Sequence, residues 1–208
     1  MKFQDGYDKE TAQVLVLATS NSAKVDELNQ LLKGTDFMVR SLKEIAGDCE
    51  IEESGDTLAE NAEIKARYVW EKTGFPSLAD DTGLEVDALN GGPGVHSARF
   101  AGPETNSEKN RIKLLDAMRH LAVLSDRSAQ FRTVLCYMDG NGVKQFDGVC
   151  KGHILKNERG SGGFGYDPLF QPDGYEQSFA EMDPEEKNRI SHRGRALLKF
   201  MNHFSKRK

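Results

Sequence analysis

Two adjacent acidic residues, Asp80 and Asp81, carry the clearest potential for hydrolytic chemistry in this sequence. They follow the apolar segment 75–79, which predicts a strand that delivers both carboxylates at its end. Carboxylate oxygens suit Mg²⁺, which keeps waters and bridges to substrate phosphates, so one aspartate could ligate the metal while the other acts as base. A plain turn, continuing into Thr82-Gly83, is the alternative. Successive strand side chains also point to opposite faces, so one aspartate could be structural.

A second acidic segment, residues 50–55, precedes a helix that we expect to start after Thr57 and to end before Gly74. Within this segment Glu53 is a candidate for a second metal carboxylate, although solvated acidic loop residues are the commoner case. On the helix itself Lys65 could reach a phosphate group, and a solvated lysine is the alternative.

An apolar strand at residues 14–18 leads through a short polar turn into a helix of about 12 residues. In that arrangement, free backbone N–H groups and the helix dipole face an incoming anion. The turn offers six candidate phosphate ligands, which are Thr19, Ser20, Asn21, Ser22, Ala23 and Lys24. Helix capping by Ser20 or Asn21 is the alternative, and the GxxxxGKS/T pattern of a P-loop is absent.

The glycine-rich segment 161–168 sets two aromatic residues among three glycines. Glycine lets the backbone approach a ligand closely, so Phe164 could stack on the face of a nucleotide base. Asp167 could accept a hydrogen bond from a ribose hydroxyl or a base N–H. A glycine-rich loop without a ligand is the alternative.

A basic cluster lies at the start of the last helix, which Ser191 should cap. The helix macrodipole disfavours cations in a first turn, yet His192, Arg193 and Arg195 all occur there. A bound anion would reverse this penalty, and Arg193 could hold it through two hydrogen bonds. A neutral His192 could instead donate to a base carbonyl, and Lys187 belongs to the same basic segment. A purely structural role for the cluster is the alternative.

The remaining elements predict a mixed architecture. Residues 129–139 and 142–153 read as two long strands joined by a hairpin turn at residues 140–142. We expect a helix over roughly 107–121 and a short helix that begins with Pro184. Because parallel-type crossovers are combined with an antiparallel hairpin, the sequence predicts a mixed α/β fold and not a doubly wound sheet.

Composition restricts the class of protein. The chain has 208 residues, 38% hydrophobic and 29% charged, which is typical of a soluble globular protein. The net charge of −5 makes non-specific nucleic-acid binding a poor expectation. The absence of a CxxC pair predicts a reducing compartment and no structural zinc. We expect the three cysteines to pack as small apolar residues: Cys49, Cys136 and Cys150.

The amino-terminal residues 1–12 are polar, and we expect a frayed tail there ahead of a single domain at residues 13–208. The tail lacks a basic region followed by an apolar one, so no secretory signal is expected. The apolar run at 14–18 is too short to span a membrane, and the cytoplasm is the simplest location.

Five motifs occur in a characteristic order: TSNSAK, EESGDTLAENAEIKA, LADDTGLEVDALNGGPGVHSARFAG, GSGGFGYDPLF and EEKNRISHRG. Together, over residues 14–205, they resemble the RdgB/Ham1 family of pyrophosphatases that act on deaminated purine nucleoside triphosphates. The resemblance implies a two-lobed α/β fold of the ITPase/Maf-like kind, with a long mixed, curved sheet flanked by helices and an active-site cleft between the lobes. It also implies a homodimer and Mg²⁺-dependent hydrolysis of ITP, dITP and XTP to the monophosphate and pyrophosphate.

The resemblance further implies individual roles. Asp81 would be the proton acceptor and, with Glu53, a ligand of Mg²⁺, while Asp80 would support activation of the water. Beside the resemblance, our own mechanistic hypothesis is that Lys24, Lys65 and Arg193 neutralise negative charge that develops on the phosphates. The triphosphate would be contacted by Thr19, Ser20, Asn21, Ser22, Ala23 and Lys24, and the base and sugar by Phe164, Gly165, Tyr166 and Asp167. The base and phosphates would also be contacted by Lys187, His192 and Arg193. Thr82 would make a further substrate contact. Many family members carry Ser in place of Thr82, and several carry Gly in place of Ser20.

Two rival functions share part of this pattern. A Maf-like pyrophosphatase of the same broad fold would act on other nucleotides, and a nucleotide-binding sensor would bind without hydrolysis. The presence of both Asp80 and Asp81 favours an enzyme over a sensor.

Overall fold

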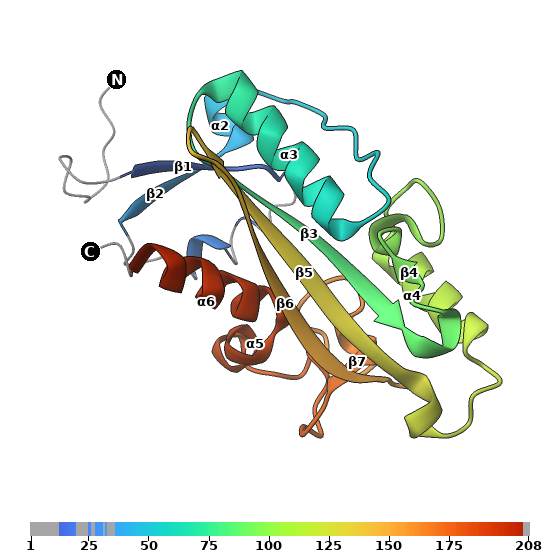
Figure 1. Cartoon of the computed structure of the whole chain (residues 1–208). Coiled ribbons are helices and arrows are strands. Elements are labelled where there is room, and N and C mark those ends of the chain that lie inside the picture. Colours follow the sequence, from blue (N-terminus) through green and yellow to red (C-terminus); the bar gives the residue numbers. More distant parts are fainter. Residues whose placement is uncertain (1–12, 20–24, 26–27, 31, 33–35, 206–208) are drawn as a thin grey trace.

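The computed structural model describes residues 13–19, 25, 28–30, 32 and 36–205 (Figure 1). The tail expected at residues 1–12 and the candidate phosphate ligands Ser20, Asn21, Ser22, Ala23 and Lys24 lie outside the described residues.

A mixed sheet of seven strands forms the centre of the molecule, in the order β2-β1-β3-β5-β6-β7, with β4 paired to β3 off this path. The strands are β1 Gln13–Leu17, β2 Phe37–Ser41, β3 Ser77–Val86, β4 Pro93–Gly94, β5 Ser128–Asp139, β6 Gly142–Ile154 and β7 Phe170–Pro172. β1 pairs in parallel with β2 and β3, whereas β3, β5, β6 and β7 pair in antiparallel fashion. The predicted mixed α/β fold is therefore confirmed.

Helices flank both faces of the long strands (Figure 1). The α-helices whose bounds lie within the described residues are α2 Leu42–Ala46, α3 Leu58–Thr73, α4 Ser107–Ala117, α5 Pro184–Ile190 and α6 His192–Ser205. Short 3₁₀ turns occupy Asp87–Leu89, Ser97–Arg99, Leu124–Arg127 and Asp167–Leu169. The predicted start and end of α3 are confirmed, because Thr57 forms a capping box with Glu60 and Gly74 adopts the left-handed conformation at φ 71°.

The β5–β6 hairpin is also confirmed, with Gly140-Asn141 between its strands. The end of one predicted helix differs from the structure. The helix expected to reach residue 121 ends at Ala117, and Arg127 donates to the carbonyl oxygens of Met118 and Leu121 at 2.8 and 3.3 Å. The buried guanidinium supplies hydrogen-bond donors to carbonyl oxygens that follow the last helical residue, which favours the end of the helix at Ala117.

The strand predicted over residues 75–79 is longer in the structure and ends later. β3 continues through Asp80 and Asp81 to Val86, and β5 pairs with it from Ser77 to Val86. The carboxylates are tolerated inside a paired strand because buried cations neutralise them from both faces of the sheet, as described below. β2 and α2 were not predicted; α2 begins with a capping box at Ser41.

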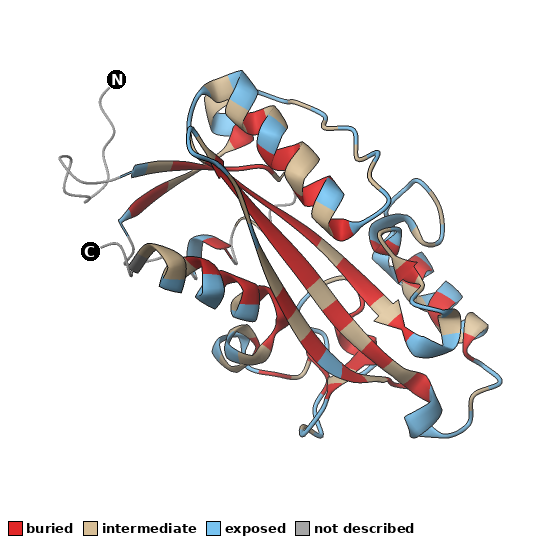
Figure 2. Ribbon diagram, viewed as in Figure 1, coloured by how far each residue is buried: buried red, intermediate tan, exposed pale blue. Residues whose placement is uncertain are grey.

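The alternation of side chains along β3 divides the core between two helices. On one face Leu78 packs in a cluster with α6, and on the other Ala79 packs in a cluster with α3. Figure 2 shows the buried positions following the long strands and the inward sides of both helices. A third cluster, which includes Leu84 and Phe131, fills the opposite end of the sheet beneath α4 and β7.

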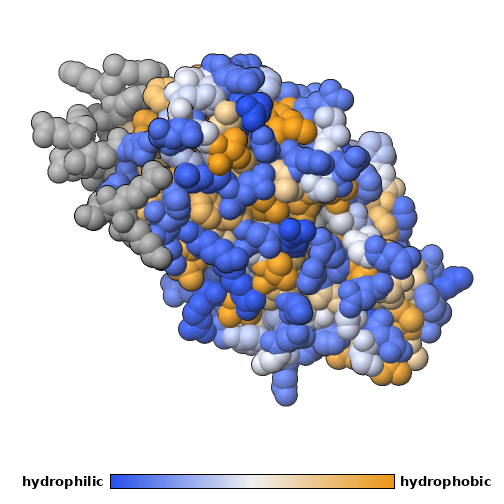
Figure 3. Space-filling model, viewed as in Figure 1, coloured by the Kyte–Doolittle hydropathy of each residue, from blue (hydrophilic) through white to orange (hydrophobic). Residues whose placement is uncertain are grey.

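The three cysteines pack as expected. Cys136 and Cys150 are buried free thiols, and burial raises the pKa of Cys150 to about 11. Cys49 is half-buried and packs against the cluster that includes α3. The viewed surface carries many hydrophilic side chains between small apolar areas (Figure 3). Among the described residues, no helix combines the length and apolarity needed to cross a membrane.

Candidate active site

The acidic pair is split between the two faces of β3. Asp80, 1% exposed, pairs with Arg193 of α6, and Asp81, 7% exposed, pairs with Lys65 of α3. The opposite orientation is the ordinary pleat of a strand. Two adjacent carboxylates therefore belong to two different polar clusters.

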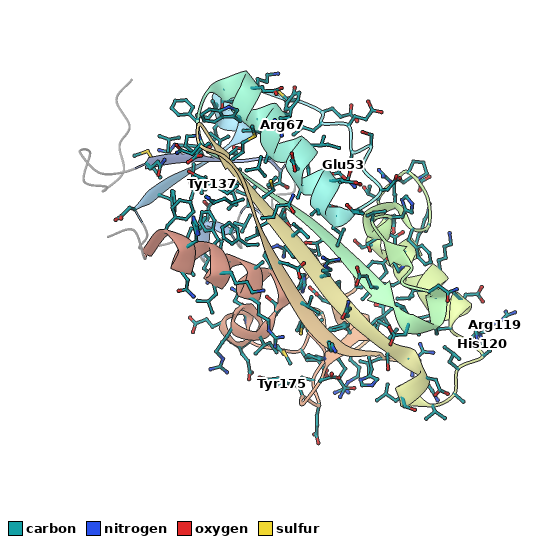
Figure 4. The ribbon with its side chains drawn as sticks, viewed as in Figure 1. Glu53, Arg67, Arg119, His120, Tyr137 and Tyr175 are labelled. Atoms are coloured by element: carbon teal, nitrogen blue, oxygen red, sulfur yellow. The ribbon has the colours of Figure 1, made fainter. Side chains whose placement is uncertain are left out.

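On the α3 face, two carboxylates converge on one ammonium. Lys65 Nζ lies 2.6 Å from Asp81 Oδ1 and 2.9 Å from Glu53 Oε1. Figure 4 labels Glu53 on the segment that runs alongside α3. Burial acts to lower the pKa of Lys65, but the attraction of Asp81, Asp80 and Glu53 outweighs it, so the pKa is raised.

The same convergence tests whether the residues suit Mg²⁺. Glu53 and Asp81 come from separate segments and present oxygens to a common position, now contacted by Lys65 Nζ. Within the described part of the chain, no group of three or more His, Cys, Asp or Glu side chains forms a metal site. Two carboxylates are nevertheless a sufficient protein share for Mg²⁺, which takes its other ligands from water and phosphates.

On the α6 face, a buried guanidinium holds the other carboxylate. Arg193, 1% exposed, donates to Asp80 Oδ2 from Nη2 at 3.1 Å and from Nε at 3.3 Å. Its Nη2 also donates to Thr82 Oγ1 at 3.3 Å, and Thr82 Oγ1 lies 2.6 Å from the hydroxyl oxygen of Thr133. The first turn of α6 is thus joined to β3 by charge-assisted hydrogen bonds, and the neutral contact between Thr82 and Thr133 extends this link to β5.

Glycine allows α6 to approach the sheet closely enough for these contacts. A Cβ on Gly148 of β6 would collide with the backbone of His192 and Ala196, and one on Gly194 would collide with the carbonyl oxygen of Asn188. Ser191 Oγ accepts from Gly194 N at 3.1 Å, which fits the predicted capping role. Arg195, from the same predicted cluster, points elsewhere and donates to Val149 O.

An aromatic cavity of about 260 Å³ lies next to this cluster, and its lining includes Phe164, Gly165 and Tyr166. The His192 ring stacks on Phe131 at 4.6 Å between centroids and 18° between planes. Such flat, partly apolar walls suit a planar base. The Tyr166 hydroxyl donates to Ser97 O at 2.8 Å, and burial raises the Tyr166 pKa.

Asp167 and Lys187 form a second buried ion pair at the edge of the aromatic cavity. Lys187 Nζ lies 2.7 Å from Asp167 Oδ2, which also accepts from Phe164 N at 2.7 Å. The ammonium lies 5.2 Å from the centroid of the Phe164 ring. Asp167 therefore fixes both the glycine-rich segment and the lysine.

A larger polar cleft of about 860 Å³ adjoins the aromatic cavity, because Thr82, Ala98 and Thr105 line both. Its lining also includes four other predicted residues, namely Thr19, Glu53, Lys65 and Asp81. Among the described residues, the structure thus brings the predicted base-side residues together with Thr19, Glu53, Lys65 and Asp81 at two adjoining cavities.

Several lining residues were not among the predicted ones. Arg99 lines the polar cleft, while Ser97 and Asn110 line the aromatic cavity. Asn110 of α4 donates to Ala98 O at 2.8 Å and accepts from Ala101 N at 2.6 Å, so it fixes the segment that separates the two cavities. An asparagine within a polar helix carries no sequence signal of that role.

Comparison with known proteins agrees with this geometry. Residues 15–203 match the model of the Ham1 family. A dITP/XTP pyrophosphatase of Desulforamulus reducens is 50% identical over 188 residues, which cover 90% of this chain and 93% of that protein. The Ham1 protein of Staphylococcus aureus matches with a TM-score of 0.85 and 34% identity over 94% of this chain and 100% of that one. A HAM1 protein of Coxiella burnetii matches with a TM-score of 0.85 and 41% identity over 93% and 99%.

Proposed function

The chain belongs to the Ham1 family, and we propose on that premise that it hydrolyses ITP, dITP and XTP to the monophosphate and pyrophosphate. The observation that supports this most is the junction of an aromatic cavity with a polar cleft at Thr82. A purine base would occupy the first and a triphosphate the second. Removal of deaminated purines from the nucleotide pool is the consequence.

The acidic residues divide the chemistry between them. Asp81 accepts the proton of a water that attacks the α-phosphorus, the bond to the bridging oxygen breaks, and pyrophosphate leaves. Asp80 and Arg193 orient the groups on the α6 side of β3. Lys65 forms ion pairs with Asp81 and Glu53 and places positive charge at the phosphate side of the cleft.

Mg²⁺ is the metal that we propose, with Glu53 and Asp81 as its protein ligands. When bound, it would neutralise phosphate charge and polarise the phosphoryl oxygens for attack. The candidate triphosphate ligands are Thr19, which lines the polar cleft, together with Ser20, Asn21, Ser22, Ala23 and Lys24.

Base recognition is proposed for the aromatic cavity. Phe164 would contact the face of the base, and Lys187 and His192 can donate to the 6-keto oxygen of a deaminated purine. Adenine presents a 6-amino donor at that position, so its contact with these donors is unfavourable. Gly165, Tyr166 and Asp167 shape the wall for base and sugar.

A homodimer and a cytoplasmic location are further proposals, which rest on the family resemblance. Sedimentation velocity at micromolar protein tests the first: a mass twice the 23.1 kDa of the chain is expected, and a purely monomeric boundary would contradict it.

The bond that breaks can be identified with isotopes. In ¹⁸O-labelled water with Mg²⁺, we expect dITP to yield labelled dIMP and unlabelled pyrophosphate, because the attack is at the α-phosphorus. Label in pyrophosphate, or release of orthophosphate as the first product, would contradict the proposed reaction.

A further inference from the structure

Two threonine hydroxyls form a contact behind the acidic pair. Thr82 of β3 and Thr133 of β5 are direct cross-strand partners, and their hydroxyl oxygens lie 2.6 Å apart. Thr133 has 0% exposure, so its hydroxyl group cannot use bulk water as a partner. Thr82 Oγ1 also lies 3.3 Å from Asp80 Oδ2, and Arg193 Nη2 lies 3.3 Å from the same oxygen of Thr82.

The number of hydrogens fixes the direction of this chain. Each hydroxyl has one hydrogen and two lone pairs, the carboxylate of Asp80 only accepts, and the guanidinium of Arg193 only donates. If Thr133 donates to Thr82 and Thr82 donates to Asp80, every hydrogen has an acceptor. The reverse direction leaves the Thr133 hydrogen without an acceptor among the described residues and takes a donor from Asp80, which is the costly arrangement.

We propose that Thr133 is a positioning residue for the hydrolysis. Its hydroxyl donates to Thr82, directs the Thr82 hydrogen onto Asp80, and so holds Asp80 and Arg193 in the orientation that the reaction needs. Thr82 then uses its hydrogen and both lone pairs inside the protein, and it serves the substrate through Asp80 and Arg193 instead of through its own hydroxyl. The kinetic part of this inference rests on the proposed function.

The mutual dependence of these groups makes the effect measurable. Asp80 Oδ2 accepts hydrogen bonds from Thr82 Oγ1 and from two nitrogens of Arg193. Loss of one donor therefore alters the position of the carboxylate relative to the guanidinium. Thr133 itself is not among the lining residues of either cavity, which separates positioning from binding.

Two pairs of variants isolate the hydroxyl from the shape of the side chain. Thr and Val at position 133 have similar volume and differ in the hydroxyl, and Ser and Ala form a second such pair. We expect Thr133→Val to lower kcat for dITP about fivefold to tenfold with a smaller change in KM, and Thr133→Ser to be about fivefold faster than Thr133→Ala. Thr133→Ser should also unfold at a lower temperature than Thr133→Val, because it loses a buried methyl group.

We thus expect Thr133→Ser to be the more active but the less stable variant when it is compared with Thr133→Val. A role in packing alone would give activity and stability the same order. Thr133→Val with the parental kcat, or Thr133→Ser as slow as Thr133→Ala, would overturn the proposal. If Thr133→Val does not fold, the Ser and Ala pair still decides.

A second measurement does not depend on activity. Urea unfolding should be measured for Thr82→Val, Thr133→Val and the double variant. The loss of unfolding free energy in the double variant should be smaller than the sum of the two single losses, because both substitutions remove the same hydrogen bond. Additive effects would overturn the hydroxyl chain. A parent enzyme that releases no pyrophosphate would contradict the proposed function and leave this cycle to decide the chain separately.

Discussion

Lys65 Nζ and Asp81 Oδ1, 2.6 Å apart, join α3 to the central strand β3 at the wall of the polar cleft. Asp80, one residue earlier, turns to the opposite face and pairs with α6. Each helix is thus tied to the sheet at the acidic pair, and stability and chemistry share the same side chains. The variants below separate the two.

Asp81→Asn removes the proposed proton acceptor and keeps the size of the side chain. We expect kcat for dITP to fall by about 10²–10⁴-fold, because general base catalysis contributes that range. Fluorescence titration should show that nucleotide binding is retained to within about tenfold. Asp116→Asn, at an exposed position of α4, is the matched control and should behave as the parent. An Asp81→Asn enzyme within a few-fold of the parental kcat would remove Asp81 from the mechanism.

Lys65→Met leaves Asp81 and Glu53 without their shared ammonium. Since the Lys65 side chain is buried, we expect the free energy of unfolding to fall by about 1–3 kcal/mol near neutral pH. The folded-state pKa of Lys65 is raised, so the ion-pair contribution is complete below the unfolded value of about 10.4 and is lost as pH rises through the folded pKa.

The difference in unfolding free energy between parent and Lys65→Met should therefore be constant to about pH 10 and shrink above it. Urea unfolding of both proteins across pH 7–11.5 measures this. A difference that stays constant to the upper limit would show that the ion pair does not carry the stability.

Gly148→Ala tests the close approach of α6 to β6. Its Cβ would collide with the backbone of His192 and Ala196, so the first turn of α6 must shift. We expect a loss of about 1–3 kcal/mol in stability, as for an overpacked core, and a fall of about tenfold in kcat as Arg193 moves from Asp80.

Gly140→Ala is the control on the same hairpin, because its Cβ would meet only the Trp70 ring, at 3.7 Å or more. It should be close to the parent in both melting temperature and kcat. Equal effects of the two substitutions would show that the approach of α6 is not what Gly148 provides.

Arg127→Met tests the buried guanidinium at the end of α4. Arg127 donates to the carbonyl oxygens of Met118, Leu121, Ile154 and Leu155, and all four would lose a donor. We expect a loss of about 2–4 kcal/mol and a fall in melting temperature of roughly 5–15 °C. The half-exposed pair of Arg132 with Asp147 is the comparison, and Arg132→Met should cost below about 1 kcal/mol. Similar melting curves for the two variants would contradict this account.

Local signals in the sequence were enough for the elements whose ends they mark. Thr57 and Gly74 bound α3, the Gly140-Asn141 turn sets the β5–β6 hairpin, and Ser191 precedes α6. Each depends on hydrogen bonds or dihedral angles within a few residues, which is what a sequence pattern records.

The ion pairs that neutralise the buried carboxylates could not be predicted in the same way, because their partners lie far apart in the sequence. Asp80 and Arg193 are 113 positions apart, and their pairing, together with that of Asp81 and Lys65, explains why β3 runs on through two carboxylates. The direction of each aspartate follows from the pleat once the strand is known, but the end of the strand was placed one residue before them. Thr133 gave no signal, since a threonine in an apolar strand is ordinary until its partner is known.

The most direct test of the account is pyrophosphate release over a nucleotide panel, with and without Mg²⁺. We expect dITP, ITP and XTP to be turned over with kcat/KM at least about 100-fold above that for ATP, GTP, dTTP and UTP, which corresponds to about 2.7 kcal/mol of discrimination, and we expect release to require the metal. A preference for pyrimidine nucleotides, or binding of ITP with Mg²⁺ and no pyrophosphate, would contradict it.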